Sequence, residues 1–186
     1  MGRRTVFMDL QGTLGGEGSG DIRDFEFFPF AIEAIKLVND NDMLAIIITN
    51  QSHIAKGNFT LDEYYDYEGE LLRLVEEKGA KINGIYCCPH GKEDNCICKK
   101  PLDGLVRKAQ EKFHIDLGNS YLIGDMGYSD MVLSKNLGCK GILVKTGVGE
   151  GSLNEFRHTW EHVEPYFIAS NILEGIKFIL KDLKGE

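Results

Sequence analysis

Long hydrophobic runs are absent from this sequence of 186 residues. A membrane-spanning helix needs about 20 consecutive apolar residues, and the apolar segments here are far shorter. The charged start, MGRR, is followed by a short strand-like run instead of the longer apolar region and cleavage site of a signal peptide. We therefore expect a cytoplasmic protein that does not associate with a membrane.

Basic tracts are also missing, and the net charge is −8. A nucleic-acid-binding protein needs a cluster of lysine and arginine side chains to neutralise phosphates, so this composition disfavours nucleic acid as a partner. A small phosphorylated metabolite can still bind to an acidic protein where the local charge is positive. The sequence carries no signal for an oligomeric state.

Proline is scarce, with 4 residues, while 42% of the residues are hydrophobic. This composition excludes extensive disorder and is sufficient for an ordinary hydrophobic core. The length fits one domain over residues 1–186, and no linker, repeat or low-complexity segment interrupts it.

Strand-like and helix-like segments alternate along the chain and predict an α/β fold. We expect strands at residues 5–8, 43–48, 82–87, 121–123, 141–145 and 167–168, and helices at 29–38, 60–78, 101–114, 129–136 and 172–183. The strand segments are apolar throughout, which is typical of a three-layer, Rossmann-like parallel sheet with helices on both faces. Such sheets bind ligands at the carboxyl ends of their strands, where Asp9, Thr49 and Asp125 are expected to lie.

Four of the five cysteines are concentrated in residues 87–98. Without an export signal, this clustering indicates a metal site more than disulfides. The pairs Cys88-x-His90 and Cys96-x-Cys98 offer three thiolates and one imidazole, a set that fits tetrahedral Zn²⁺. Cys87 is an alternative to Cys88 as a ligand on spacing alone.

Four polar motifs occur in a fixed order: Asp9-Leu10-Gln11-Gly12-Thr13, Thr49-Asn50-Gln51-Ser52, Lys99-Lys100-Pro101, and Gly124-Asp125 with Asp130 nearby. Their order and spacing resemble the haloacid dehalogenase superfamily over nearly the whole chain. The stretches around the cysteines and at 144–147 (Val-Lys-Thr-Gly) make the chain most similar to the D-glycero-D-manno-heptose-1,7-bisphosphate phosphatases and the related histidinol-phosphate phosphatase domain. The resemblance implies a single hydrolase domain with no large cap domain and with a small zinc-binding loop.

The resemblance also assigns roles in phosphoryl transfer. It implies that Asp9 is the nucleophile and that Mg²⁺ is held by Asp9, the backbone carbonyl of Gln11 and Asp125. Asp130 is expected to orient Lys100 or the groups around the metal. In the zinc loop, the resemblance favours Cys88 over Cys87 as the ligand.

The remaining candidates surround the phosphate and the substrate. Lys100 is expected to hold a phosphate oxygen, Thr49 and Asn50 to donate further hydrogen bonds, and the backbone at Gly12 to curl around the phosphate. We expect Gln51, Ser52 and Lys99 to bind the rest of the substrate.

Gln11 departs from the superfamily pattern, which has aspartate at this position. That aspartate protonates the leaving group and later activates water, and glutamine does neither well. Two further residues near the expected substrate depart from the family pattern: Met126 stands where the family has lysine, and His53 where it has glycine. The resemblance therefore does not assign heptose bisphosphate as the substrate of this protein.

We therefore expect a Mg²⁺-dependent phosphatase or phosphotransferase that acts through Asp9 on a small, sugar-like phosphomonoester, with slow turnover. The alternative is a former phosphatase that binds a phosphorylated ligand without turnover. A polynucleotide 3′-phosphatase is a third reading, which the acidic composition disfavours.

Overall fold

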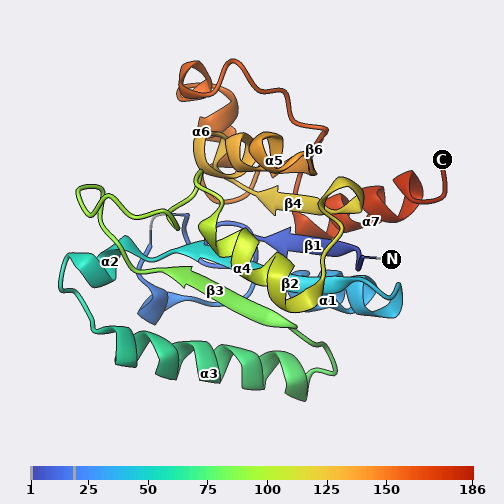
Figure 1. Ribbon diagram of the computed structural model, residues 1–186. Coiled ribbons are helices and arrows are strands. Elements are labelled where there is room, and N and C mark those ends of the chain that lie inside the picture. The colour runs from blue at the N-terminus through green and yellow to red at the C-terminus, as the bar shows by residue number, and fades with distance from the viewer. Residues whose placement is uncertain (1, 19) are drawn as a thin grey trace.

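Six parallel strands form the centre of the molecule in the order β3-β2-β1-β4-β5-β6 (Figure 1). The computed structural model describes residues 2–18 and 20–186. The strands are β1 (Thr5–Met8), β2 (Leu44–Asn50), β3 (Gly84–Cys88), β4 (Tyr121–Gly124), β5 (Lys140–Val144) and β6 (Phe167–Ala169).

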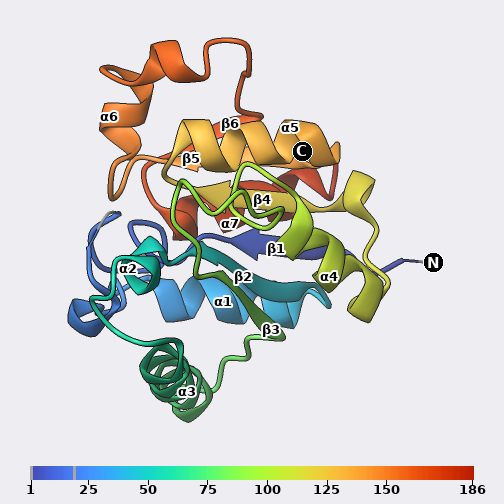
Figure 2. The ribbon, with the colours of Figure 1, turned by 60° about the vertical axis from the view of Figure 1, so that its left-hand side comes forward.

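Helices cover both faces of this sheet, as the sequence predicts. One face carries α1 (Ala31–Asp40), α3 (Leu61–Glu77) and α7 (Ile172–Asp182), and the other carries α4 (Gly104–Phe113) and α5 (Val132–Leu137). Figure 2 shows α1 and α3 on the side of the sheet opposite to α4 and α5. Two short helices, α2 (Ser52–Ala55) and α6 (Gly149–Leu153), lie near the carboxyl ends of the strands.

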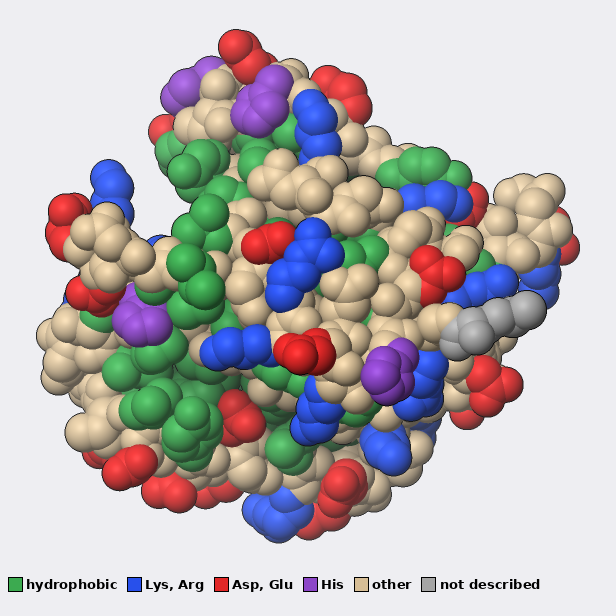
Figure 3. Space-filling view, in the orientation of Figure 1, with side chains coloured by type: hydrophobic (Ala, Val, Ile, Leu, Met, Phe, Trp, Pro, Cys, Tyr) green, Lys and Arg blue, Asp and Glu red, His purple; other side chains and the backbone are tan. Residues whose placement is uncertain are grey.

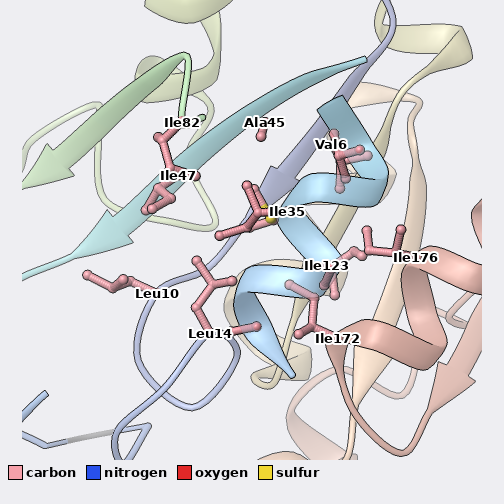
Figure 4. Close-up of a cluster of buried hydrophobic side chains, with 14 of the residues drawn as sticks. Val6, Leu10, Leu14, Ile35, Ala45, Ile47, Ile82, Ile123, Ile172 and Ile176 are labelled. Carbon is pink, nitrogen blue, oxygen red and sulfur yellow. The ribbon is translucent and has the colours of Figure 1, made fainter. Parts of the chain in front are cut away.

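The hydrophobic core is divided by the sheet into two clusters. In β1, Val6 and Met8 face the α1 side and Phe7 faces the α4 side, because successive side chains of a strand point to opposite faces. Figure 4 shows the first cluster, in which Ile35 of α1 packs with side chains of several strands and of α7. Truncating a core residue of this kind costs about 2–5 kcal/mol of stability.

Local sequence signals set several element boundaries. The helix predicted from residue 60 begins with a capping box, in which Thr60 accepts a hydrogen bond from the backbone of Glu63, and Glu63 accepts one from the backbone of Thr60. The helix predicted to start at Pro101 instead begins at Gly104, because Lys99 and Leu102 form a turn before it. The helix predicted from residue 129 starts earlier, as a π-helix at Gly127–Met131 that continues into α5.

The strand order reverses between β1 and β4. The chain proceeds from β1 through β2 to β3 at one edge, then returns to the other side of β1 with β4. In open parallel sheets, ligands bind where the strand order reverses.

Over residues 2–18 and 20–186, none of the helices has the length and apolar character needed to cross a membrane. Acidic and basic side chains are interspersed on the face seen in Figure 3.

Candidate active site

Three carboxylates converge at the reversal point of the sheet. Asp9 follows β1, Asp125 follows β4, and Asp130 lies in the π-helix. One oxygen of each lies within 4.8 Å of the others. A small cavity of about 50 Å³ opens here, and it is lined by Asp9, Gln11, Gly18, Thr49, Asn50, Lys100, Asp125, Met126 and Ser129.

Lys100 places a positive charge among these carboxylates. Its Nζ atom donates to Oδ1 of Asp9 and to Oδ1 of Asp130, at 2.7 Å each. The Lys100 side chain is buried, with an exposed fraction of 3%. Burial alone would lower the pKa of Lys100, but the charges of Asp130 and Asp9 outweigh it and raise the pKa. Lys100 is therefore held as a cation whose position is fixed by two carboxylates.

Asp125 is enclosed by backbone. Its Oδ2 atom accepts a hydrogen bond from the N–H of Val148 at 2.8 Å. A Cβ atom at Gly12 would lie 2.0 Å from this oxygen, and one at Gly147 would lie 2.1 Å from it. Both glycines have positive φ, 82° and 57°, so a side chain there is excluded by conformation as well as by space.

Burial and mutual repulsion raise the pKa values of two of these carboxylates, Asp125 and Asp130. The pKa of Asp125 is raised well above its ordinary value by burial and then by the charges of Asp9 and Asp130. Burial raises the pKa of Asp130 to about 6, against the lowering effect of Lys100. Like charges packed at this distance are stabilised by a cation. Carboxylate oxygens are ligands that Mg²⁺ prefers, so this donor set fits a divalent cation.

The carboxyl end of β2 holds Lys100 in place. The side chain of Asn50 accepts from the backbone N–H of Lys100 at 3.0 Å and donates to its carbonyl at 3.2 Å. Asn50 is thus bonded to the backbone that carries the cation, a contact that sequence reasoning did not predict. Thr49 is buried and its Oγ1 accepts from Nε2 of Gln51 at 3.0 Å.

Gln11 is buried in the same network. Its Oε1 atom accepts from Nε2 of Gln51 at 2.7 Å, and its Nε2 donates to the carbonyl of Gly20. The second bond ties the backbone at Gly20 to the buried Gln11 side chain. An aspartate at this position has no N–H to donate, so the glutamine performs a structural task that the aspartate of the superfamily pattern cannot.

The cysteine loop forms a second candidate metal centre. Cys88, His90, Cys96 and Cys98 each place one ligand atom within 4.8 Å of the others. The Sγ atom of Cys88 lies 3.1 Å from that of Cys98 and 3.7 Å from that of Cys96, and Nδ1 of His90 lies 3.2 Å from Sγ of Cys98. Four ligands around Zn²⁺ at about 2.0–2.3 Å are separated by roughly 3.3–3.8 Å in a tetrahedron, so the cluster fits this ion.

Cys87 points away from the cluster. It packs against the hydrophobic core on the α1 side of the sheet, where burial raises its pKa to about 12. This follows from the strand geometry of β3, because adjacent residues face opposite sides. Cys139 is buried in the core on the other side of the sheet.

Lys99 connects the cysteine loop to α2. Its Nζ atom donates to Oγ of Ser52 at 2.5 Å and to the carbonyl of His90 at 3.1 Å. Lys99 and Ser52 line a surface pocket outside the carboxylate cavity. His53 lies on the same short helix, with Nδ1 at 3.8 Å from Oδ2 of Asp21.

The sequence analysis named residues 144–147 only for the resemblance that they carry, and it assigned no role to the loop after β5. Thr146 donates from Oγ1 to the carbonyl of Gly12 at 2.6 Å, while Gly147 and Val148 enclose Asp125. The signal that could have found them is position, because residues 145–148 follow the carboxyl end of a strand next to β4.

Comparison with known proteins gives a consistent result. A family model for HAD-hydrolase-like proteins matches residues 97–175. A D-glycero-beta-D-manno-heptose-1,7-bisphosphate 7-phosphatase of Pseudomonas aeruginosa is 31% identical over 158 residues, which cover 83% of this chain and 88% of that protein. The enzyme of the same name from Haemophilus ducreyi is 35% identical over 162 residues, with coverages of 79% and 86%.

A solved structure agrees with the fold. The D,D-heptose 1,7-bisphosphate phosphatase from B. bronchiseptica, crystallised with magnesium and phosphate, superposes with a TM-score of 0.86 at 23% identity, covering 96% of this chain and 99% of that chain. The relatives, together with the family model, define the class of this protein as a haloacid dehalogenase-like hydrolase. Within that class, the relatives narrow the assignment: the chain belongs to the D-glycero-beta-D-manno-heptose-1,7-bisphosphate 7-phosphatase family.

Proposed function

We propose that this protein is a Mg²⁺-dependent phosphatase or phosphotransferase that acts through an aspartyl-phosphate at Asp9 on a small, sugar-like phosphomonoester. The observation that carries the proposal is the buried position of Lys100 between Asp9 and Asp130, next to Asp125. An ion-paired lysine and three carboxylates gathered at one small cavity are costly to bury without a ligand that uses them. The family supports the same reaction.

Asp9 performs the bond-making step. One of its oxygens attacks phosphorus while the bond from phosphorus to the leaving oxygen breaks. The leaving oxygen then takes a proton from water, and a second water molecule attacks the aspartyl-phosphate to release inorganic phosphate and restore Asp9. Lys100 stays close enough to Asp9 to hold a phosphate oxygen and to stabilise the charge that develops on it.

Asp9, Asp125 and the backbone carbonyl of Gln11 would hold Mg²⁺, with Asp130 supporting Lys100. When bound, Mg²⁺ neutralises the repulsion between the carboxylate and the phosphate dianion. Thr49, Asn50 and the backbone at Gly12 bind the transferred phosphate. Gln51, Ser52 and Lys99 contact the rest of the substrate.

Zn²⁺ on Cys88, His90, Cys96 and Cys98 has a structural role in this proposal. Cys98 directly precedes Lys99 and Lys100 in the sequence. Closing the loop with four ligands therefore fixes the segment from which both lysines extend. We take residues 1–186 as one hydrolase domain, with this loop in place of a large cap.

A second candidate is a phosphate-ligand-binding protein without turnover. Its support is Gln11, whose amide is bonded on both sides to Gln51 and Gly20. A glutamine with these two hydrogen bonds stabilises the position of Gly20 but transfers no proton. The two candidates differ in whether Asp9 is phosphorylated.

Phosphate release from a panel of sugar phosphates in the presence of Mg²⁺ tests the proposal. The natural protein should release phosphate from at least one of them, and Asp9→Asn should not, because an amide is not a nucleophile. Asp103→Asn, an exposed aspartate on the surface, is the matched control and should retain the activity. Equal rates for the natural protein and Asp9→Asn would exclude the proposed enzyme.

A further inference from the structure

Gln11 lines the carboxylate cavity, and both ends of its amide group are already bonded. Its Oε1 atom accepts from Gln51, and its Nε2 atom donates to the carbonyl of Gly20. The side chain is buried, so the hydrogen bonds keep it in one position. An amide does not transfer a proton to a leaving oxygen. The attack of Asp9 on phosphorus therefore proceeds without a general acid at position 11.

The other residues of the cavity wall do not replace this proton donor. General acids in proteins are most often histidine, aspartate, glutamate, lysine, tyrosine or cysteine. Among the residues that the structure describes, those of this kind in the wall are Asp9, Lys100 and Asp125. Asp9 is the nucleophile of the proposed function. Lys100 is bonded to Asp9 and Asp130, and Asp125 is a proposed metal ligand whose Oδ2 atom is bonded to the N–H of Val148.

Hydroxyl and amide groups complete the polar part of the wall. They belong to Thr49, Asn50 and Ser129. These groups donate hydrogen bonds, but they are too weakly acidic to transfer a proton to the leaving oxygen. The leaving oxygen therefore departs as an oxyanion, and the rate at which its bond to phosphorus breaks depends on how well the leaving group carries the negative charge.

The phosphate esters of a sugar differ in this property. The oxygen on the anomeric carbon shares that carbon with the ring oxygen, which withdraws electrons and makes the anomeric hydroxyl more acidic than the other hydroxyls of the sugar. A phosphate on a primary carbon has a poorer leaving group, because its oxyanion lacks this stabilisation. A site without a general acid therefore favours the anomeric phosphate.

We propose that the substrate is a sugar phosphorylated at its anomeric carbon, and that Gln11 is the residue that determines this specificity. Asp9 attacks phosphorus, the bond from phosphorus to the anomeric oxygen breaks, and the electron pair stays on that oxygen, which then takes a proton from water. This inference rests on the proposed function and narrows its substrate class. It sets the protein apart from its relatives, whose names describe 7-phosphatases.

Matched pairs of sugar phosphates test the inference. Glucose 1-phosphate is compared with glucose 6-phosphate, and mannose 1-phosphate with mannose 6-phosphate, in the presence of Mg²⁺. Both members of a pair form the same aspartyl-phosphate, so the comparison uses kcat/KM, which reports the steps up to release of the sugar. The natural protein should favour each 1-phosphate by at least about tenfold.

Gln11→Asp distinguishes the effect of the leaving group from recognition of the sugar. A carboxylic acid at position 11 accelerates the poorer leaving group more, so the preference for the 1-phosphates should fall towards one. Gln11→Asn is the matched control, because it has the length of aspartate without the acid, and it should keep the preference of the natural protein. An equal preference in all three proteins would show that sugar binding determines it, and would overturn the inference.

A second measurement needs no variant. In the first turnover of the natural protein, the rate should rise at least about tenfold from phenyl phosphate to nitrophenyl phosphate, because the nitro group makes the leaving oxygen more acidic. Equal rates for these two esters, or a natural protein that prefers the 6-phosphates, would overturn the inference and leave the proposed function standing. If no ester releases phosphate and Asp9 is never phosphorylated, the proposed function fails, and this inference fails with it.

Discussion

Replacing Gln11 by aspartate restores the carboxylate that the superfamily pattern places there. A positioned general acid–base contributes about 10²–10⁴-fold to a rate. The substitution also removes a hydrogen bond, because Gln11 donates to the carbonyl of Gly20 and aspartate has no N–H to replace that bond. Losing one such bond costs on the order of 1 kcal/mol. We therefore expect Gln11→Asp to raise turnover by roughly 10²-fold, the lower end of the range.

An aryl phosphate with Mg²⁺ is the substrate for this test, because its leaving group needs little protonation. The natural protein should show a rapid burst as Asp9 is phosphorylated and then slow turnover, since water is not activated. Gln11→Asp should speed the slow phase. Gln11→Asn is the matched control, because it has the length of aspartate and cannot act as a base.

Two results of this comparison would refute the reasoning. An equal gain in Gln11→Asp and Gln11→Asn would show that loosening the loop, and not the carboxylate, accelerates turnover. If the natural protein and Gln11→Asp are both no faster than Asp9→Asn, the enzyme assignment fails and the ligand-binding function replaces it.

Three further predictions follow from the two metal centres and from Asp130. Metal analysis should find about one zinc per chain. Cys96→Ser should lose the zinc and about 2 kcal/mol of stability, which corresponds to a melting temperature lower by about 4–8 °C. The control Cys139→Ala should keep the zinc, and full zinc content in Cys96→Ser would contradict the assigned ligands. Calorimetry of Asp125→Asn should show Mg²⁺ binding weakened by at least about tenfold, and an unchanged affinity would remove Asp125 from the metal site. Because burial raises the pKa of Asp130 to about 6, the folded protein keeps a proton that the unfolded chain has released, so the stability of metal-free protein should fall by on the order of 1–3 kcal/mol as the pH rises from about 4 to about 6. Denaturant midpoints measured across this pH range should change less for Asp130→Asn than for the natural protein. An identical dependence on pH in the two proteins would show that Asp130 is not the group responsible.

The parts of the fold that sequence predicts are those that local patterns determine. The apolar segments at β1 and β4 and the capping box at Thr60 depend on residues close together in the chain. The convergence of Asp9 and Asp125 followed from a general rule of parallel sheets.

The features that sequence could not predict depend on contacts between distant residues. The bonds between the Asn50 side chain and the Lys100 backbone join positions far apart in sequence. The π-helix at Gly127–Met131 is another case, since a Cβ at Gly127 would lie 2.0 Å from the ring of Trp160. Gln11 was recognised as a departure, but only the structure shows that its amide bonds to Gly20.

The central claim is that Asp9 carries the phosphoryl group during turnover. The direct test is to mix the natural protein with an aryl phosphate and Mg²⁺, stop the reaction with acid within the burst, and map the modified residue by peptide mass spectrometry. We predict a phosphoryl group on Asp9, and none in Asp9→Asn or after chelation of Mg²⁺. Release of phosphate at an undiminished rate by Asp9→Asn, with Asp9 unmodified in the natural protein, would contradict the account.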